Sequence, residues 1–101
     1  MRLRDIAHAR SGDKGDISNI SVIVHSMADY ERVRREVTPQ RVQECLRGVV
    51  HGVVDRFELP QLGALNFVLY RALDGGVTRS LALDAHGKCL SSVLLSMELQ
   101  S

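Results

Sequence analysis

The residues of this chain that could do chemistry are concentrated in one short run, Arg-Ser-Gly-Asp-Lys-Gly-Asp at positions 10–16. Arg10 and Lys14 supply cationic hydrogen-bond donors, and the two glycines let a ligand approach the backbone N–H groups closely. The four charges cancel, so the run is not a simple phosphate-binding loop. We predict a preorganised polar loop that binds a small anionic ligand, or the anionic end of a larger one. The predicted loop residues are Arg10, Ser11, Gly12, Asp13, Lys14, Gly15 and Asp16.

Two other interpretations of this run stay open. Asp13 and Asp16 could cap the backbone N–H groups of their own loop, which would make the run structural. The same two carboxylates could hold a divalent cation. They supply too few oxygen ligands for a calcium site, however, and Lys14 competes for their charge. We therefore predict no metal at this position.

The remaining chemistry-bearing residues are more scattered. The four histidines have no metal-ligand spacing, and they are His8, His25, His51 and His86. His86 lies two residues from both Asp84 and Lys88, so it could act as a general acid or base if the fold brings it near the first run. Asn66 lies in an apolar stretch and must be hydrogen-bonded if it is buried. Its expected role is to pin the sheet or the loop rather than to contact a substrate.

Size and composition limit the classes of function. With 101 residues, 45% apolar and 25% charged, the chain is predicted to be one globular domain covering residues 1–101. A net charge of +1 and the absence of tryptophan argue against nucleic-acid binding. No apolar run suits a membrane helix or a signal peptide, so we expect a cytoplasmic protein with no membrane contact. Cys45 and Cys89 lack metal-site spacing and are expected to be reduced. No cofactor motif is present.

Several elements are predicted to position the charged run. Alternating apolar residues predict strands near residues 3–10, 18–25, 53–59 and 78–84. Helix-starting signals occur at Ser26 and at Thr38-Pro39, where the hydroxyls can cap the first turns. Helical spacing predicts a further helix over residues 88–99. Residues 62–73 are ambiguous: the leucine spacing and the length favour a helix, although Phe67 and its neighbours would suit a buried strand equally well.

The predicted order of elements gives an α+β fold. One mostly antiparallel sheet with helices packed on it fits a two-layer, ferredoxin-like sandwich, although the pattern does not exclude other two-layer folds. The strand over residues 18–25 carries apolar residues on both faces. Since a small sheet with two apolar faces needs cover on both, we predict that the chain self-associates, as a homodimer.

The chain also resembles a known family. Residues 10–16 with Asn19 resemble the start of the C-terminal domain of the acyclic terpene utilisation protein A (AtuA) family, a domain that also occurs as a free-standing protein. The likeness continues at Ala64-Leu-Asn-Phe67, at Gly75-Gly76 with Thr78-Arg-Ser80, and at Asp84-Ala-His-Gly-Lys88. The resemblance implies a ferredoxin-like domain and a link to bacterial breakdown of branched acyl compounds. On this basis Asn19, Arg79 and Lys88 join the predicted ligand-binding residues.

Two functions follow as hypotheses. The resemblance implies an accessory or binding module that acts with a separate large AtuA-type chain in the catabolism of branched or terpene-derived acyl compounds, with CoA thioesters as one form of the substrate. The alternative is a small lyase or hydratase whose site lies at an oligomer interface. In that case Asp13, Asp16 or His86 would transfer the proton. Neither reading assigns a catalytic residue from a recognised motif.

Overall fold

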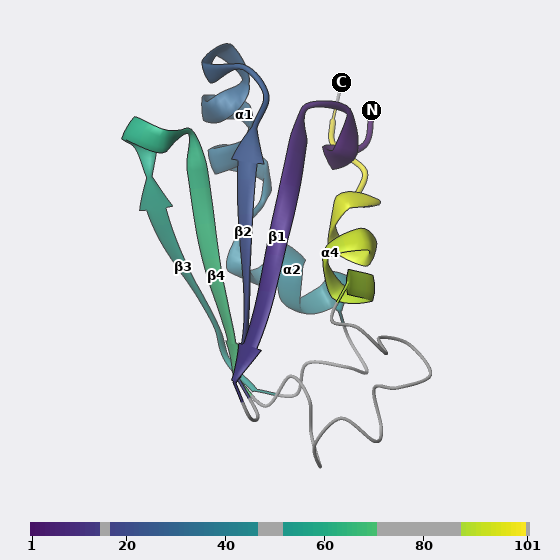
Figure 1. Cartoon of the computed structure of the whole chain (residues 1–101). Coiled ribbons are helices and arrows are strands. Elements are labelled where there is room, and N and C mark those ends of the chain that lie inside the picture. Colours follow the sequence, from purple (N-terminus) through teal and green to yellow (C-terminus); the bar gives the residue numbers. More distant parts are fainter. Residues whose placement is uncertain (15–16, 47–51, 71–87, 101) are drawn as a thin grey trace.

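The computed structural model describes residues 1–14, 17–46, 52–70 and 88–100, with the backbone alone described at residues 13, 14 and 88–90 (Figure 1). Its sheet contains β1 (Ala7–Lys14), β2 (Ile17–Val24), β3 (Val54–Leu59) and β4 (Ala64–Tyr70). The strands lie in the order β1-β2-β4-β3, and every neighbouring pair is antiparallel. The predicted α+β class with one antiparallel sheet is confirmed.

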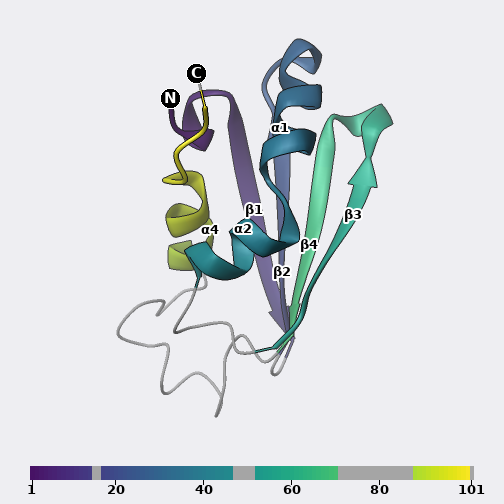
Figure 2. The same ribbon diagram turned by 180° about the vertical axis from the view of Figure 1, so that it is seen from behind.

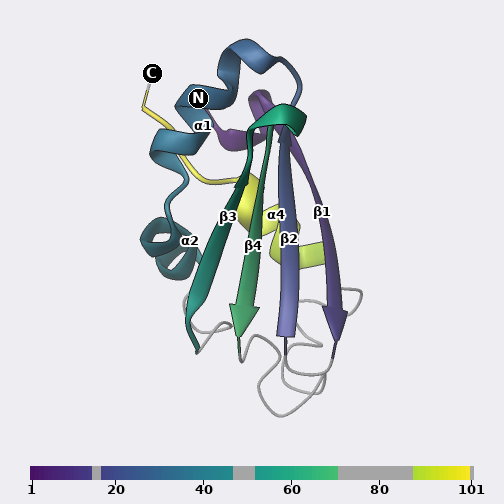
Figure 3. The same ribbon diagram turned by 90° about the vertical axis from the view of Figure 1, so that its left-hand side faces the viewer.

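In the described part of the chain, three helices cover one face of this sheet. They are α1 (Tyr30–Glu36), α2 (Pro39–Cys45) and α4 (Lys88–Leu95). Figure 2 shows α2 in front of the strands and α4 beside β1, whereas Figure 3 looks onto the strands themselves, with α4 behind them. The molecule therefore has two layers, and the described helices leave one face of the sheet bare, which we call the open face. None of the described helices is long and apolar enough to span a membrane.

The core lies between the sheet and the helices. Every second residue of β2 is buried, and its partners on β4 are Phe67 opposite Ile20 and Leu65 opposite Val22. Burying one such side chain stabilises the fold by roughly 1.5–3 kcal/mol. The helices and the residues that cap their C-terminal ends contribute fully buried apolar residues to the same cluster, namely Val33, Val37, Val42, Leu46 and Leu94.

Both predicted helix starts are confirmed. Ser26 caps a short 3-10 helix (Met27–Asp29) that runs into α1, and its Oγ accepts a hydrogen bond from the Ala28 N–H at 3.3 Å. Thr38 caps α2 in the same way, accepting from the Arg41 N–H at 3.2 Å, with Pro39 at the first helical position. Hydroxyl caps satisfy N–H groups that the first turn leaves without intrahelical partners.

The helix favoured for residues 62–73 is wrong over residues 62–70, the part of that range that the structure describes. A 3-10 turn (Pro60–Leu62) and Gly63 in the left-handed conformation (φ 62°) lead instead into β4. Leu65, Phe67 and Leu69 alternate along β4 and are all fully buried. Pairing with β2 on one side and β3 on the other satisfies the β4 backbone, and this tertiary pairing outweighs the helical spacing of the leucines.

The first hairpin also differs from the prediction. Residues 3–5 form a 3-10 turn rather than the start of a strand, and β1 runs on to Lys14. Only residues 15–16 separate β1 from β2, so the predicted seven-residue polar loop is mostly strand. Near the other end of the chain, α4 stops at Leu95 rather than continuing to residue 99. The chain then passes alongside the N-terminus, where Arg2 and Glu98 form a β-bridge. The predicted strand at 78–84 lies outside the described residues.

Candidate functional site

The register of the sheet places residues from four strands side by side across the open face. The central row contains Arg10 of β1, Ser21 of β2, Asn66 of β4 and Phe57 of β3, each opposite the next. The adjacent row toward the first hairpin turn contains Gly12, Asn19, Val68 and Asp55. Residues that lie far apart in the sequence therefore meet on one surface.

A hydrogen bond holds the centre of this surface together. The Ser21 hydroxyl donates to Asn66 Oδ1 at 2.9 Å, and both side chains are half-buried. This bond uses the amide oxygen, and the NH2 group of Asn66 makes no hydrogen bond to a described residue, so it can donate to a ligand or a partner. The expected role of Asn66 in pinning the sheet thus has a defined contact, since the bond joins β4 to β2.

Arg10 supplies positive charge beside this pair. It is exposed, and it forms no ion pair with any described residue. Gly12 lies two residues beyond Arg10 on β1, and no atom of the described residues lies within 4 Å of a Cβ added there, so this position leaves open space where a side chain would stand. Guanidinium and amide donors beside such a gap suit an anionic or carbonyl-bearing group.

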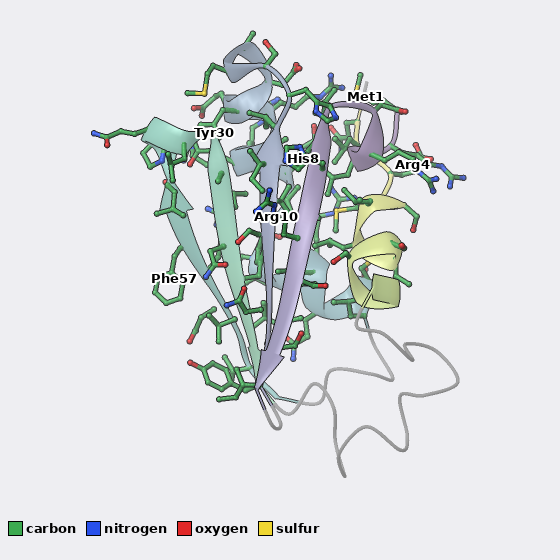
Figure 4. All side chains as sticks on the ribbon, viewed as in Figure 1. Met1, Arg4, His8, Arg10, Tyr30 and Phe57 are labelled. Carbon is green, nitrogen blue, oxygen red and sulfur yellow. The ribbon has the colours of Figure 1, made fainter. Side chains whose placement is uncertain are left out.

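Apolar side chains surround these polar groups. Phe57 is 51% exposed and Tyr70 37% exposed, and Ile17 and Leu59 are also exposed. Figure 4 shows Phe57 projecting from β3 to the side away from α4. At one end of the open face the His8 and His25 rings stack with centroids 5.4 Å apart. An exposed apolar surface enclosing polar groups is typical of an interaction site.

A separate cleft lies between β1 and α4. Its volume is about 500 Å3, and its lining residues are Ala9, Arg10, Ser11, Ser91, Ser92 and Leu95. Ser91 is 9% exposed, and its hydroxyl makes no hydrogen bond to any described residue. A buried polar group without a partner is rare in folded proteins, and it directs attention to this cleft as a place where a ligand could bind.

The structure divides the predicted site between the two faces of the sheet. Side chains alternate along a strand, so Arg10, Gly12 and Asn19 belong to the open face, whereas Ser11 lies on the helix side. Asp13 and Lys14 belong to β1 by their backbone, in register with Ser18 and Ile17. Lys88 begins α4. Gly15, Asp16, Arg79 and His86 lie outside the described residues.

Sequence reasoning missed Ser21, Phe57, Ser91 and Ser92 as site residues. The sequence could have identified Ser21 and Phe57, because the alternation along their strands places them on the face of the sheet away from the buried residues. Ser91 and Ser92 carry none, since serine in a helix is common and nothing in the sequence shows that α4 packs beside β1.

Cys45, which is half-buried, and Tyr30, which is buried, have raised pKa values, and neither lies on the open face. Burial raises the pKa of the Cys45 thiol, and Arg41 offsets part of that rise. Burial likewise raises the pKa of Tyr30, with a further contribution from the negative charge of Glu58. Both groups are expected to stay neutral at physiological pH. They belong to the packing of the helical layer.

Comparison with known proteins supplies the family. The sequence model of a protein family described as the AtuA ferredoxin-like domain matches residues 1–100 of the chain. The searches of curated proteins and of solved structures found no match. Four residues that carry the sequence resemblance lie in the central row of the open face or in the row adjacent to it. They are Arg10, Gly12, Asn19 and Asn66. The chain belongs to the AtuA ferredoxin-like domain family.

Proposed function

We propose that this chain is a binding module that acts with a separate large AtuA-type chain in the breakdown of branched or terpene-derived acyl compounds, with CoA thioesters as the candidate form of the substrate. Membership of the AtuA ferredoxin-like domain family supports an association with a larger AtuA-type protein. In this proposal the module does not carry out the chemistry itself. It completes a surface or a site on the large chain.

The open face is the observation that carries this proposal. A sheet face with exposed Phe57, Tyr70 and Ile17 around a hydrogen-bonded polar centre can bury apolar area and also fix the orientation of a partner. Aromatic side chains in such positions often supply a large share of binding energy. The large chain is therefore the proposed occupant of this face.

Arg10 has a separate role in this proposal. Its guanidinium and the NH2 group of Asn66 would contact the anionic end of the ligand at the junction of the two chains. Charge-assisted hydrogen bonds of this kind favour one orientation of a carboxylate or phosphate group. The earlier expectation of an anion site then moves from a loop to the centre of the open face.

The test is binding between this chain and a large AtuA-type chain from the same cells. Isothermal titration calorimetry is carried out with the unmodified chain, with Phe57→Ser and with Leu62→Ser. Leu62 is 69% exposed and lies in the turn between β3 and β4, so it is a matched apolar control away from the central rows. We expect Phe57→Ser to weaken binding by about tenfold or more, and Leu62→Ser to change it by less than about twofold.

Two outcomes would overturn this assignment. Absence of a complex between the two chains would remove the partner, and equal affinity for both variants would remove the open face as the docking surface. Sedimentation of the chain alone at tens of micromolar identifies the competing occupant. A dimer that Phe57→Ser dissociates would assign the face to a second copy of the chain instead.

A further inference from the structure

Two histidines meet at the end of the open face near the N-terminus. His8 lies on β1, and His25 directly follows the last residue of β2. The His25 N–H donates to the Ile6 carbonyl at 2.9 Å, which holds this residue beside β1. Because His8 pairs with Ile23, His25 lies on the diagonal from it, across a distance that aromatic side chains can span. Strand pairing therefore brings together two imidazoles that are distant in the sequence.

Both rings are exposed, and Figure 4 shows His8 toward the end of β1 that lies nearer Met1. Within the described residues, each ring contacts the other: the centroids lie 5.4 Å apart, and the ring planes are inclined by 24°. Neither imidazole forms a hydrogen bond or an ion pair with a described residue. Their ring nitrogens can therefore bind a ligand without breaking a described contact.

The separation of the two rings is close to the one that a shared metal ion requires. A zinc ion lies about 2.0–2.1 Å from a histidine nitrogen, and therefore about 3.2 Å from the ring centroid. At the tetrahedral angle, two imidazoles on one ion have centroids about 5.2 Å apart. The observed separation of 5.4 Å nearly matches this value.

The orientation of the rings differs from that of a metal-bound pair. Two nearly parallel planes do not direct a nitrogen lone pair from each ring at one point. Rotation about the Cβ–Cγ bond turns a ring nitrogen and moves the ring centre little, and this torsion of histidine has a broad range. Binding thus requires rotation of exposed rings rather than a movement of the backbone.

Imidazole nitrogen determines the class of ion. It suits Zn²⁺, Cu²⁺ and Ni²⁺, whereas Ca²⁺ and Mg²⁺ prefer oxygen ligands. The described residues contain no group of three His, Cys, Asp or Glu side chains that could hold a metal ion. The histidine pair would therefore supply two ligands, and the other positions of the ion would be open to water or to an oxygen atom of a ligand.

We propose that His8 and His25 bind one divalent transition-metal ion, for which Zn²⁺ is the probe, at this end of the open face. The ion takes one nitrogen from each ring, and its open positions lie on the same surface as Arg10. Because Arg10 is two residues from His8 on β1, its positive charge opposes the ion weakly. This site goes beyond the proposed function, which uses neither histidine.

Zinc titration of the full chain tests the site. Isothermal titration calorimetry at neutral pH measures the affinity, and NMR follows the imidazole signals of His8 and His25. We expect one ion to bind per chain and to shift both sets of signals, and we expect Mg²⁺ at the same concentration to shift neither. His8→Gln and His25→Gln should each weaken zinc binding by about tenfold or more. Both side chains are exposed, so neither substitution should lower Tm.

Two further variants distinguish this site from general attraction of zinc to the chain. His51→Gln removes a histidine that lies outside the described residues, and it should leave the zinc affinity unchanged. Arg10→Gln removes a like charge near the ion, and it should strengthen zinc binding by about two- to threefold.

Three results would each overturn the inference. One is the absence of saturable zinc binding by the unmodified chain. Another is equal zinc affinity of the unmodified chain and of both His8→Gln and His25→Gln, which would place the ion elsewhere. The third is an equal loss with His51→Gln, which would indicate attachment to unrelated imidazoles. The calorimetric test of docking to the large chain uses neither zinc nor these variants, so the two proposals fail separately.

Discussion

The Ser21 hydroxyl and the Asn66 amide oxygen lie 2.9 Å apart in the middle of the open face. Ser21 comes from the first hairpin and Asn66 from the second, so one short contact joins the two halves of the sheet. Arg10 and Phe57 extend the same row to β1 and β3. Residues of the proposed docking surface therefore also help to hold the sheet together.

The Ser21–Asn66 bond makes the first prediction. Asn66→Ala should lower the free energy of unfolding by about 1 kcal/mol, because a half-buried hydrogen bond is lost. A double-mutant cycle with Ser21→Ala should show a coupling energy of about 0.5–1.5 kcal/mol in urea unfolding. Asn66→Asp keeps the acceptor oxygen and should cost less stability than Asn66→Ala. Additive single substitutions would show that the contact does not stabilise the sheet.

Arg56 makes the second prediction. Its guanidinium donates to the carbonyls of Arg34 at 2.6 Å and Val37 at 3.0 Å, at the end of α1, and it also pairs with Glu58 at 3.0 Å. Hydrogen bonds from a charged donor to the last carbonyls of a helix are stabilising. Arg56→Met should therefore destabilise the fold by about 2–3 kcal/mol in chemical unfolding.

A matched arginine controls for the change of charge. Arg35 is exposed on α1, and its side chain makes no hydrogen bond to a described residue. Arg35→Met should change the stability by no more than about 0.5 kcal/mol. Similar losses for the two variants would mean that net charge, rather than the contact with the end of α1, sets the effect.

The third prediction compares the stability of alanine variants at two glycines, Gly63 and Gly12. Gly63 has φ 62°, and a Cβ there would lie 2.9 Å from Val24 Cγ2 and 2.7 Å from Met27 Sδ. Gly63→Ala should therefore cost about 1–2 kcal/mol from backbone strain alone, and more if Val24 cannot move. Gly12→Ala meets no atom within 4 Å in the described part of the chain and should be neutral or slightly stabilising. Thermal unfolding followed by circular dichroism measures both variants, and a large loss at Gly12 would contradict the geometry of the open face.

Cys45 makes the fourth prediction, which concerns pH. Burial raises the pKa of its thiol, and the thiol lies 3.5 Å from the Val93 carbonyl oxygen of α4. The folded state therefore holds the thiol proton more tightly than the unfolded state does. The stability from this group is present in full below about pH 8.5, the ordinary thiol pKa, and is lost as pH rises through the higher pKa of the folded state.

Alkylation measures this shift directly. The rate of iodoacetamide reaction at Cys45, followed by mass spectrometry of its peptide, should rise with a midpoint above about pH 8.5 in the folded chain and near that value in urea. Cys45→Ala should remove the loss of stability at high pH that ionisation of this thiol causes. Equal midpoints in the folded and urea-unfolded chain would show that the thiol is not desolvated.

The sequence alone was sufficient for the features that depend on neighbouring residues. Ser26 and Thr38 identify two helix starts because a hydroxyl cap acts on N–H groups two or three residues away. Alternation identifies β2 because one buried face produces a period of two along a single strand. The family resemblance was also readable, since it rests on short runs of residues, and the family match over residues 1–100 bears it out.

Only the tertiary structure decided where the polar run lies and what residues 64–70 become. Residues 10–14 look like a loop in sequence, but pairing with β2 draws them into β1, and alternation then places Arg10 and Ser11 on opposite faces. Leu65 and Leu69 suit a helix by spacing. They lie in a strand because β2 and β3 satisfy the β4 backbone from both sides. Pairing between strands distant in sequence determines both outcomes, and the free energy of such pairing is not a property of either segment alone.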